Sequence, residues 1–319
     1  MDVSSIVMYL GFVLASYSVV GNDTIQTLGT FLSSNERKRW WVLWAFAGGI
    51  LACTLIFGYL NHAGDVSYGR LEKYPLPDPF EWYFLLPPII LLLLTRTGIP
   101  VSTSFLILTF FNPENLTSMV TKSVWGYVVA FVAALTLYFT ISRLLEKKFI
   151  ENPITRRENE VWTVLQWGST GFLWSQWLIQ DFANIYVYLP RALTPWGLAF
   201  SLLIILVILA YIIASKGGTI QHIVRSKTNT VDVRSATIID FSYGIILYFF
   251  KELNNVPMST TWVFIGILAG REIALNFMLR KNEGRRAMFR NLAVDLTKVV
   301  IGLVVSILLV FAVKYLATL

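Results

Sequence analysis

Hydrophobic residues fill long stretches of this chain, and polar positions are concentrated between them. Several of these stretches approach the roughly 20 residues that a helix needs to cross a bilayer. They are Ile6–Val20, Trp41–Leu60, Phe80–Leu94, Val124–Ile141, Ala192–Ser215, Ile238–Phe250, Trp262–Leu268 and Val299–Leu316. The pattern predicts an all-α protein that crosses the membrane several times, and it leaves no segment for a separate soluble domain.

The composition agrees with this prediction. Of the 319 residues, 55% are hydrophobic and only 14% are charged, whereas about a quarter of a soluble domain is charged. A net charge of +7 would suit nucleic acid, but basic cytoplasmic loops explain it better, so we expect a lipid bilayer and no nucleic acid as partner. The single cysteine, Cys53, excludes an intrachain disulfide. The first apolar run lacks the basic start and cleavage site of a removable signal peptide.

Two polar motifs occur twice in the chain, in the same order and at nearly the same spacing. The first motif pairs Asn22 with Gln180, Asp23 with Asp181, and Gln26 with Asn184. The second motif, Pro-x-Ser-Thr, occupies residues 100–103 and 257–260. An acid pair, Glu81 and Asp240, precedes the two Ser-Thr motifs as a weaker match. The chain is therefore predicted to contain two repeats, residues 1–145 and 161–319, joined by a basic cytoplasmic linker at 146–160.

The distribution of lysine and arginine predicts how the repeats are oriented. Basic residues are concentrated in four loops, at 34–39, 143–157, 216–234 and 271–290. If these loops are cytoplasmic, each half contains a helix broken at its Asp motif, a full span, a re-entrant hairpin and another full span. Three net crossings per half invert the second repeat relative to the first and place both termini outside, in a plasma or cytoplasmic membrane.

The paired aspartates predict a polar site inside the membrane. A carboxylate in the bilayer costs about 2.5–3.5 kcal/mol on insertion scales, so it persists mainly where it faces a polar cavity or a partner. The alternative is that each aspartate only holds a helix break by hydrogen bonds. Oxygen ligands suit a small cation such as Na⁺. The candidate ligands are Asn22, Asp23, Gln180 and Asp181, with Glu81 and Asp240 either completing the set, binding a proton, or capping the hairpin arms.

The Ser-Thr motifs predict an anion site. Each follows a proline-containing turn and opens a short apolar segment, so each begins a half-helix. Free amides and the positive end of the dipole at such an N-terminus suit a tetrahedral oxyanion, although an ordinary Ser/Thr N-cap is the alternative. The candidate substrate-binding residues are Ser102, Thr103, Ser104, Ser259, Thr260 and Thr261, together with Gln26 and Asn184. A cation beside the anion would offset its charge, which is a physical basis for symport.

At these residues the sequence resembles the inorganic phosphate transporter (PiT) family of secondary carriers, which includes sulfate permeases. The signature Asn-Asp-x-Ala-Asn-Ala-x-Gly-Thr is matched in part by Asn22, Asp23, Gly29 and Thr30, and again by Asp181, Ala183 and Asn184. The signature Pro-x-Ser-Thr-Thr-His is matched by Pro100, Ser102 and Thr103, and by Pro257, Ser259, Thr260 and Thr261. Its histidine is Phe105 or Trp262 here, and Gln26, Gln180, Val187 and Tyr188 are further departures, so the chain is a divergent member.

The resemblance implies cation-coupled phosphate uptake, with sodium bound by the aspartates and amides and the anion bound by the Ser-Thr hairpins. Sulfate or another oxyanion is the alternative substrate, and H⁺ is the alternative coupling ion. An anion channel and a receptor or structural role remain alternatives from other classes. We expect neither an enzyme nor an organic cofactor, because His62 and His222 both fall in predicted loops and no nucleotide-binding glycine pattern occurs. The sequence also allows a homodimer.

Overall fold

The computed structural model describes residues 2–97, 101–141, 149, 152–215, 232–253, 259–278 and 285–316. The first half contains α1 (Val3–Ser34), α2 (Trp40–Asn61), η1 (Trp82–Leu85), α3 (Leu86–Arg96), α4 (Thr103–Phe111), η2 (Pro113–Asn115) and α5 (Leu116–Ile141). The second half contains α7 (Arg156–Tyr186), α8 (Pro195–Ala214), α10 (Val233–Leu253), α11 (Thr260–Met278) and α12 (Arg285–Leu316). The predicted all-α class is confirmed. Pro100, Pro257, His222 and much of the predicted basic loops lie outside the described residues.

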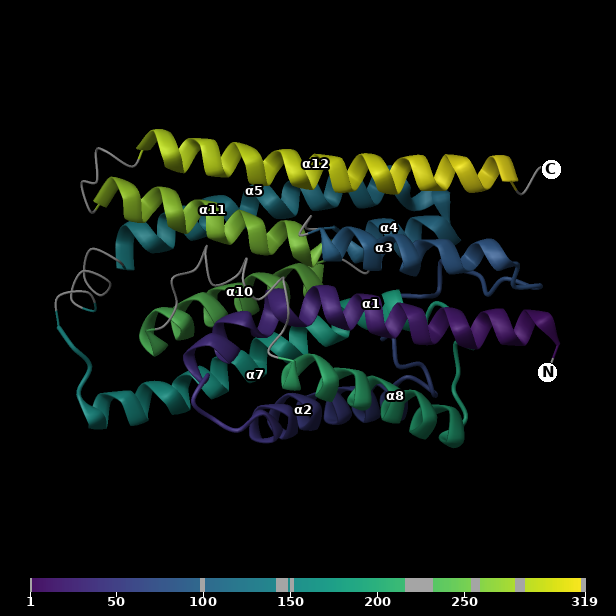
Figure 1. The fold of residues 1–319 in the computed structure, drawn as a ribbon, viewed down its shortest axis with the longest axis horizontal. Helices are drawn as coiled ribbons and strands as arrows, with labels where there is room; N and C mark the ends of the chain where they lie inside the picture. The colour runs from purple at the N-terminus through teal and green to yellow at the C-terminus, as the bar shows by residue number, and fades with distance from the viewer. Residues whose placement is uncertain are drawn as a thin grey trace.

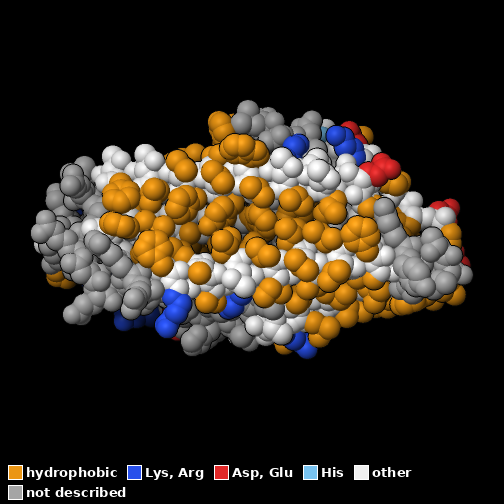
Figure 2. Space-filling view, turned by 90° about the horizontal axis from the view of Figure 1, so that it is seen from above, with side chains coloured by type: hydrophobic (Ala, Val, Ile, Leu, Met, Phe, Trp, Pro, Cys, Tyr) orange, Lys and Arg blue, Asp and Glu red, His pale blue; other side chains and the backbone are white. Residues whose placement is uncertain are grey.

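In the described part of the chain, five helical segments are long and apolar enough to cross a bilayer. They are Val3–Thr24, Trp40–Asn61, Pro113–Thr140, Pro195–Ala214 and Met288–Ala312. Hydrophobic side chains extend along most of the face seen in Figure 2, as expected for a surface in contact with lipid. The chain is an integral membrane protein.

Helix α7 is as long as a span but is not among these five segments. It has 31 residues, and from Leu173 to Tyr186 only Ser175 is not buried. Several of its buried side chains are polar, among them Gln176, Gln180 and Asp181. A helix that is covered by protein can carry such residues where a lipid-facing helix cannot. Helix α7 therefore forms the polar interior of the bundle.

The long helices lie roughly along one axis, with α1 and α7 near the middle (Figure 1). The start of α1 and the end of α12 lie at the same end of the molecule. The α1–α2 connection lies toward the opposite end, together with the start of α7. This arrangement agrees with the prediction that the termini share one side of the membrane. Which side is outside stays a prediction.

Two helical hairpins enter the bundle from opposite ends. Helices α3 and α4 lie side by side in one half of the molecule, and α10 and α11 in the other, with their inner ends near the middle (Figure 1). The packing partners are exchanged between the halves: α4 packs on α12 and α11 on α5, while α8 packs on α1 and α2 on α7. This exchange supports the predicted repeats, whose inverted relation stays a prediction.

The predicted helix breaks at the aspartates are wrong. Helix α1 continues without interruption from Val3 to Ser34, and α7 continues to Tyr186. Asparagine side chains donate to both carboxylates, so no backbone amide has to leave its helix to serve them. Helix α11 is also longer than the predicted half-helix. It runs on to Met278 because it packs along α5 beyond the apolar run.

Candidate functional site

Two helices begin near the middle of the molecule, and a serine caps each of them. The Ser102 hydroxyl accepts a hydrogen bond from the Phe105 amide at 3.2 Å, at the start of α4. The Ser259 hydroxyl accepts one from the Trp262 amide, also at 3.2 Å, at the start of α11. These two hydroxyls therefore cap their helices, which is the alternative that the sequence left open. A capped start still leaves the first backbone amides of each helix without carbonyl partners inside the helix.

The first aspartate is joined to the α3–α4 hairpin through its neighbour. Asn22 donates from Nδ2 to Oδ1 of Asp23 at 2.6 Å and to the Val101 carbonyl at 3.2 Å. The Thr95 hydroxyl donates to Oδ1 of Asn22 at 3.1 Å. The Thr103 hydroxyl also interacts with the Asp23 carboxylate. These contacts fix the middle of α1 to the tip of the first hairpin.

The second aspartate lies where residues of both halves meet. Asn184 donates from Nδ2 to Oδ1 of Asp181 at 2.6 Å and to the Thr103 hydroxyl at 3.0 Å. The Ser104 hydroxyl reaches the same carboxylate oxygen at 3.5 Å, and the Thr260 hydroxyl interacts with this carboxylate as well. The start of α4, from the first half, is therefore held against α7, from the second.

Several buried oxygens at this junction accept no hydrogen bond from any residue that the structure describes. They include Oδ2 of Asp23, Oδ2 of Asp181 and Oδ1 of Asn184. A buried acceptor without a donor costs about 1–3 kcal/mol, and more when it is charged, and the two carboxylates also repel each other. A cation would relieve both costs.

The donor set indicates the kind of cation. No group of three or more His, Cys, Asp or Glu side chains able to hold a metal is found among the described residues. Two carboxylates surrounded by neutral amide and hydroxyl oxygens are hard ligands of low total charge. Such a set suits Na⁺ better than a transition metal.

The two hairpin tips contact each other across the halves. The Thr261 hydroxyl donates to the Val101 carbonyl at 3.2 Å, so this carbonyl accepts from both halves. The rings of Phe105 and Trp262 meet edge to face, with centroids 5.6 Å apart. These are the two positions at which the second signature has histidine, and here they form an apolar contact at the junction.

Two more of the amide side chains predicted to bind ions, Gln180 and Gln26, are buried. Gln180 donates from Nε2 to the Leu247 carbonyl at 2.9 Å, which fixes α7 to α10 as Asn22 fixes α1 to Val101. Gln26 is buried, with 8% of its surface exposed, one helical turn after Asn22. Asn22 and Gln180 therefore position the hairpins.

The two acids matched before the Ser-Thr motifs, Glu81 and Asp240, have different surroundings. Glu81 is exposed just before η1, which argues against a place in the buried site, and its role as a cation ligand stays a prediction. Glu81 is the residue before η1, which continues directly into α3, but its side chain makes no capping hydrogen bond there. Asp240 is 1% exposed, and the hydroxyls of Thr30 and Thr170 both donate to it. Thr30 is seven residues beyond Asp23, about 10 Å further along α1. Asp240, which contacts Thr30, therefore lies closer than Asp23 to the end of the molecule opposite the termini.

Two residues near the site were missed by the sequence prediction. Tyr243 is buried on α10 and donates to the Thr260 carbonyl at 3.0 Å. Arg70, in the loop between α2 and η1, is only 6% exposed. Burial lowers the pKa of Arg70 to about 10, against the attraction of Asp181, so it is cationic at neutral pH. Neither residue belongs to a repeated motif, and a lone basic residue in a loop carries no sequence signal of burial.

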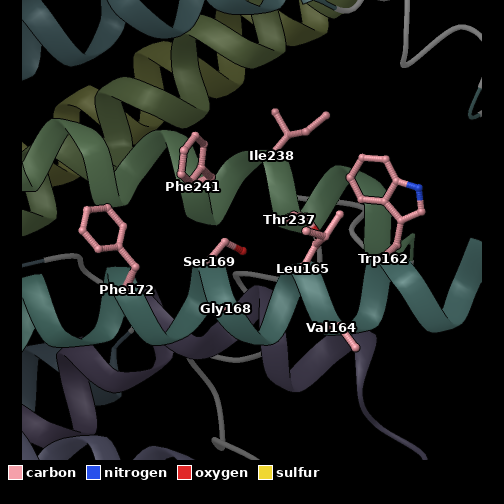
Figure 3. A pocket seen from close by; sticks show the side chains of 9 residues that line it. All are labelled: Trp162, Val164, Leu165, Gly168, Ser169, Phe172, Thr237, Ile238 and Phe241. Atoms are coloured by element: carbon pink, nitrogen blue, oxygen red, sulfur yellow. The ribbon is translucent and has the colours of Figure 1, made fainter.

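A groove between α7 and α10 lies apart from this site (Figure 3). It has a volume of about 470 Å³ and is lined by Trp162, Val164, Leu165, Gly168, Ser169, Phe172, Thr237, Ile238 and Phe241. Apart from Ser169 and Thr237 these side chains are apolar, and none of the junction residues is among them. The groove offers no chemistry for an ion.

Comparison with known proteins gives a likeness in fold. No protein-family model and no curated protein sequence matches this chain. The chain is similar to a solved structure described as the sodium-dependent phosphate transporter, with a TM-score of 0.65 and 15% sequence identity. The likeness covers 99% of this chain and 100% of that one. This membrane protein therefore shares the fold of that transporter over its whole described length.

Proposed function

We propose that the protein is a secondary transporter that carries inorganic phosphate across the membrane together with a cation, Na⁺. One observation carries the proposal: unsatisfied carboxylate oxygens and two capped helix starts from different halves meet at a single buried point. The solved structure with the same fold is described as sodium-dependent and as a phosphate transporter, and this supports the assignment.

The cation would be held by carboxylate oxygens that accept no hydrogen bond. Oδ2 of Asp23 and Oδ2 of Asp181 are the ligands that we assign to it. Asn22 and Gln180 keep these residues in register with the hairpins. We do not assign Asp240 to the cation, because the hydroxyls of Thr30 and Thr170 already donate to its carboxylate.

The phosphate would lie against the starts of α4 and α11. The amides at both N-termini and the positive ends of the two dipoles favour an anion. The hydroxyls of Thr103, Ser104, Thr260 and Thr261 add donors. Thr103, Ser104 and Thr260 would exchange their contacts with the carboxylates for contacts with the anion when the cation binds the carboxylates.

Coupling follows from charge. Phosphate alone would bring a third negatively charged group next to the two carboxylates. A bound Na⁺ would offset one of those charges, so the anion would bind with less repulsion when the cation is already in place. Because the contacts join the two halves, a movement of one half against the other would expose the site to either side in turn.

The unsatisfied acceptors favour phosphate over sulfate. Phosphate keeps at least one proton near neutral pH and can donate it, whereas sulfate has none to donate. Asn184 donates from Nδ2 to the Thr103 hydroxyl, and Oδ1 of the same side chain can accept a hydrogen bond from the protonated phosphate. A sulfate in the same place would leave the acceptor unsatisfied. Proton coupling is the alternative that the first experiment must separate from Na⁺ coupling.

The test is uptake of radiolabelled phosphate into proteoliposomes with an inward Na⁺ gradient. Wild-type protein is compared with Asp23→Asn and with Glu81→Gln, an exposed carboxylate that serves as the matched control. We expect uptake that requires Na⁺, falls more than tenfold in Asp23→Asn and is unchanged in Glu81→Gln. Thermal unfolding in detergent shows whether each variant is folded.

The alternatives give distinct results in the same assay. Uptake driven by a proton gradient without Na⁺ would overturn the coupling ion, and inhibition by excess unlabelled sulfate would overturn the substrate. Uptake that neither saturates nor responds to any cation gradient would indicate a channel.

A further inference from the structure

The loop between α2 and η1, residues 62–81, has a defined conformation. The Asp65 carboxylate accepts hydrogen bonds from the Ser67 amide at 2.7 Å, the Ser67 hydroxyl at 2.6 Å and the Gly69 amide at 2.7 Å. Gly64 and Gly69 have φ of +90° and +74°, which glycine adopts without steric cost. Its fixed shape lets the loop hold a side chain in one place.

The same loop is fastened to the end of α7 that carries Asp181. The Arg191 guanidinium donates to the Tyr74 carbonyl at 3.2 and 2.7 Å. It also donates to the carbonyls of Tyr186, Val187 and Leu189 at 3.3, 3.1 and 2.8 Å. Tyr186, where α7 ends, is five residues beyond Asp181, about 7.5 Å along the helix. The loop therefore covers the transport site at the end where both termini lie.

Arg70 belongs to this loop and points inward. Its side chain is 6% exposed, and within the described part of the chain its guanidinium forms neither a hydrogen bond nor an ion pair within 4 Å. The charge that acts on it most is the Asp181 carboxylate. Asp65, five residues before Arg70 on the same loop, is engaged in holding the loop. A guanidinium buried without close partners is costly, so its presence at the site calls for an anion.

We propose that Arg70 is an anion-binding residue of the transport site, donating to the phosphate in addition to the starts of α4 and α11. This inference rests on the proposed function and adds to it a ligand from outside both repeated motifs. A guanidinium offers two parallel donors that match two oxygens of a phosphate. When the anion is absent, Arg70 offsets the charge of Asp181 instead. It therefore favours binding of the anion once the cation has taken over that carboxylate.

The test measures two constants separately for wild-type protein, Arg70→Gln, Arg70→Lys and Arg96→Gln. Arg96 is an exposed arginine at the end of α3 and serves as the matched control. The constants are the KM for phosphate at saturating Na⁺ and the Na⁺ concentration for half-maximal uptake at saturating phosphate. Protection of the detergent-purified protein against heat by phosphate gives a second readout that needs no transport.

We expect Arg70→Gln to raise the KM for phosphate about 10–100-fold, as loss of a hydrogen bond between charged groups predicts. Protection by phosphate should be lost in the same variant. Arg70→Lys should restore most of the affinity, because it keeps the charge but not the paired donors, and Arg96→Gln should match wild type. If Arg70→Gln does not fold, Arg70→Lys decides, with an expected several-fold rise in KM at unchanged maximal rate.

The opposite results are equally clear. An unchanged KM for phosphate, or a shift confined to the Na⁺ constant, would show that Arg70 serves only Asp181 and would overturn the inference. If wild-type protein takes up no phosphate under any cation gradient, the proposed function fails, and this inference fails with it. Wild-type uptake together with a normal Arg70→Gln variant removes this inference alone.

Discussion

Two glycines on α11 allow it to approach α5 closely, and replacing them tests whether that approach holds the site together. Gly266 and Gly270 are four residues apart and so lie on one face of α11. A Cβ at Gly266 would lie 2.7 Å from the Tyr127 carbonyl oxygen, and one at Gly270 would lie 2.6 Å from that of Phe131. Both obstacles are backbone atoms of α5, which cannot rotate away as the end of a side chain can.

The size of the effect follows from these distances. An ordinary contact begins at 3.4 Å, so α11 must retreat by roughly 0.7–0.8 Å to admit either methyl group. Overpacking of this kind costs about 1–3 kcal/mol, while alanine gains up to about 1 kcal/mol over glycine inside a helix. We expect Gly270→Ala to destabilise the protein by about 1–2 kcal/mol. The double variant should cost less than the sum of the two, because one displacement relieves both contacts.

Two other helical glycines provide the control. A Cβ at Gly49 on α2 or at Gly168 on α7 would meet nothing within 4 Å. Alanine there should stabilise the protein slightly, by up to about 1 kcal/mol. Thermal unfolding in detergent, followed by circular dichroism, should therefore move in opposite directions for Gly270→Ala and Gly168→Ala.

The same displacement should reach the transport site. Thr260 and Thr261 begin α11, so a shifted helix carries them away from Asp181 and Val101. We expect Gly270→Ala to lower phosphate uptake more than its loss of stability explains, and Gly168→Ala to leave uptake unchanged. Equal stability changes for Gly270→Ala and Gly168→Ala would refute the close approach of α11 to α5, and with it the packing on which this expectation depends.

Two further predictions concern the surroundings of the site. Arg191→Ala removes the hydrogen bonds that join the loop of residues 62–81 to the end of α7. We expect faster amide hydrogen exchange in that loop with little change in the helices. Exchange as slow as in wild type would contradict the proposal that Arg191 holds the loop against α7. Thr170→Val removes one of two hydroxyls that donate to buried Asp240. It should cost about 1–3 kcal/mol in thermal unfolding, whereas Thr163→Val, at a partly exposed position of the same helix, should cost less than 0.5 kcal/mol.

The sequence predicted best those features that depend on residues close together in the chain. Long apolar runs predicted the all-α membrane class, since hydropathy depends only on the residues within one helix. The capping serines 102 and 259 marked the starts of α4 and α11, since an N-cap bonds to amides two or three residues away. The repeated motifs also drew attention to Asp23 and Asp181, because a carboxylate inside an apolar stretch is costly wherever the chain places it.

The sequence wrongly predicted helix breaks because side chains within the intact helices can donate to the aspartates. Polar residues within α1 and α7 predicted broken helices, but Asn22 and Asn184 donate to the aspartates from within intact helices. The match of Glu81 with Asp240 is weak for a different reason. Similar spacing from a motif does not place two residues at similar depths, and here one acid is exposed while the other is buried.

By itself, the sequence determined that this is a membrane-embedded helical protein with two related sets of polar residues, because hydropathy, capping and repetition are properties of single segments. Only the tertiary structure decided which of these residues meet. Thr103 reaches Asn184, 81 residues away, and Thr261 reaches Val101, 160 residues away. The burial of Arg70 likewise depends on a loop fastened to a distant helix. Such contacts arise from packing among all the helices together, and no periodicity within one segment records them.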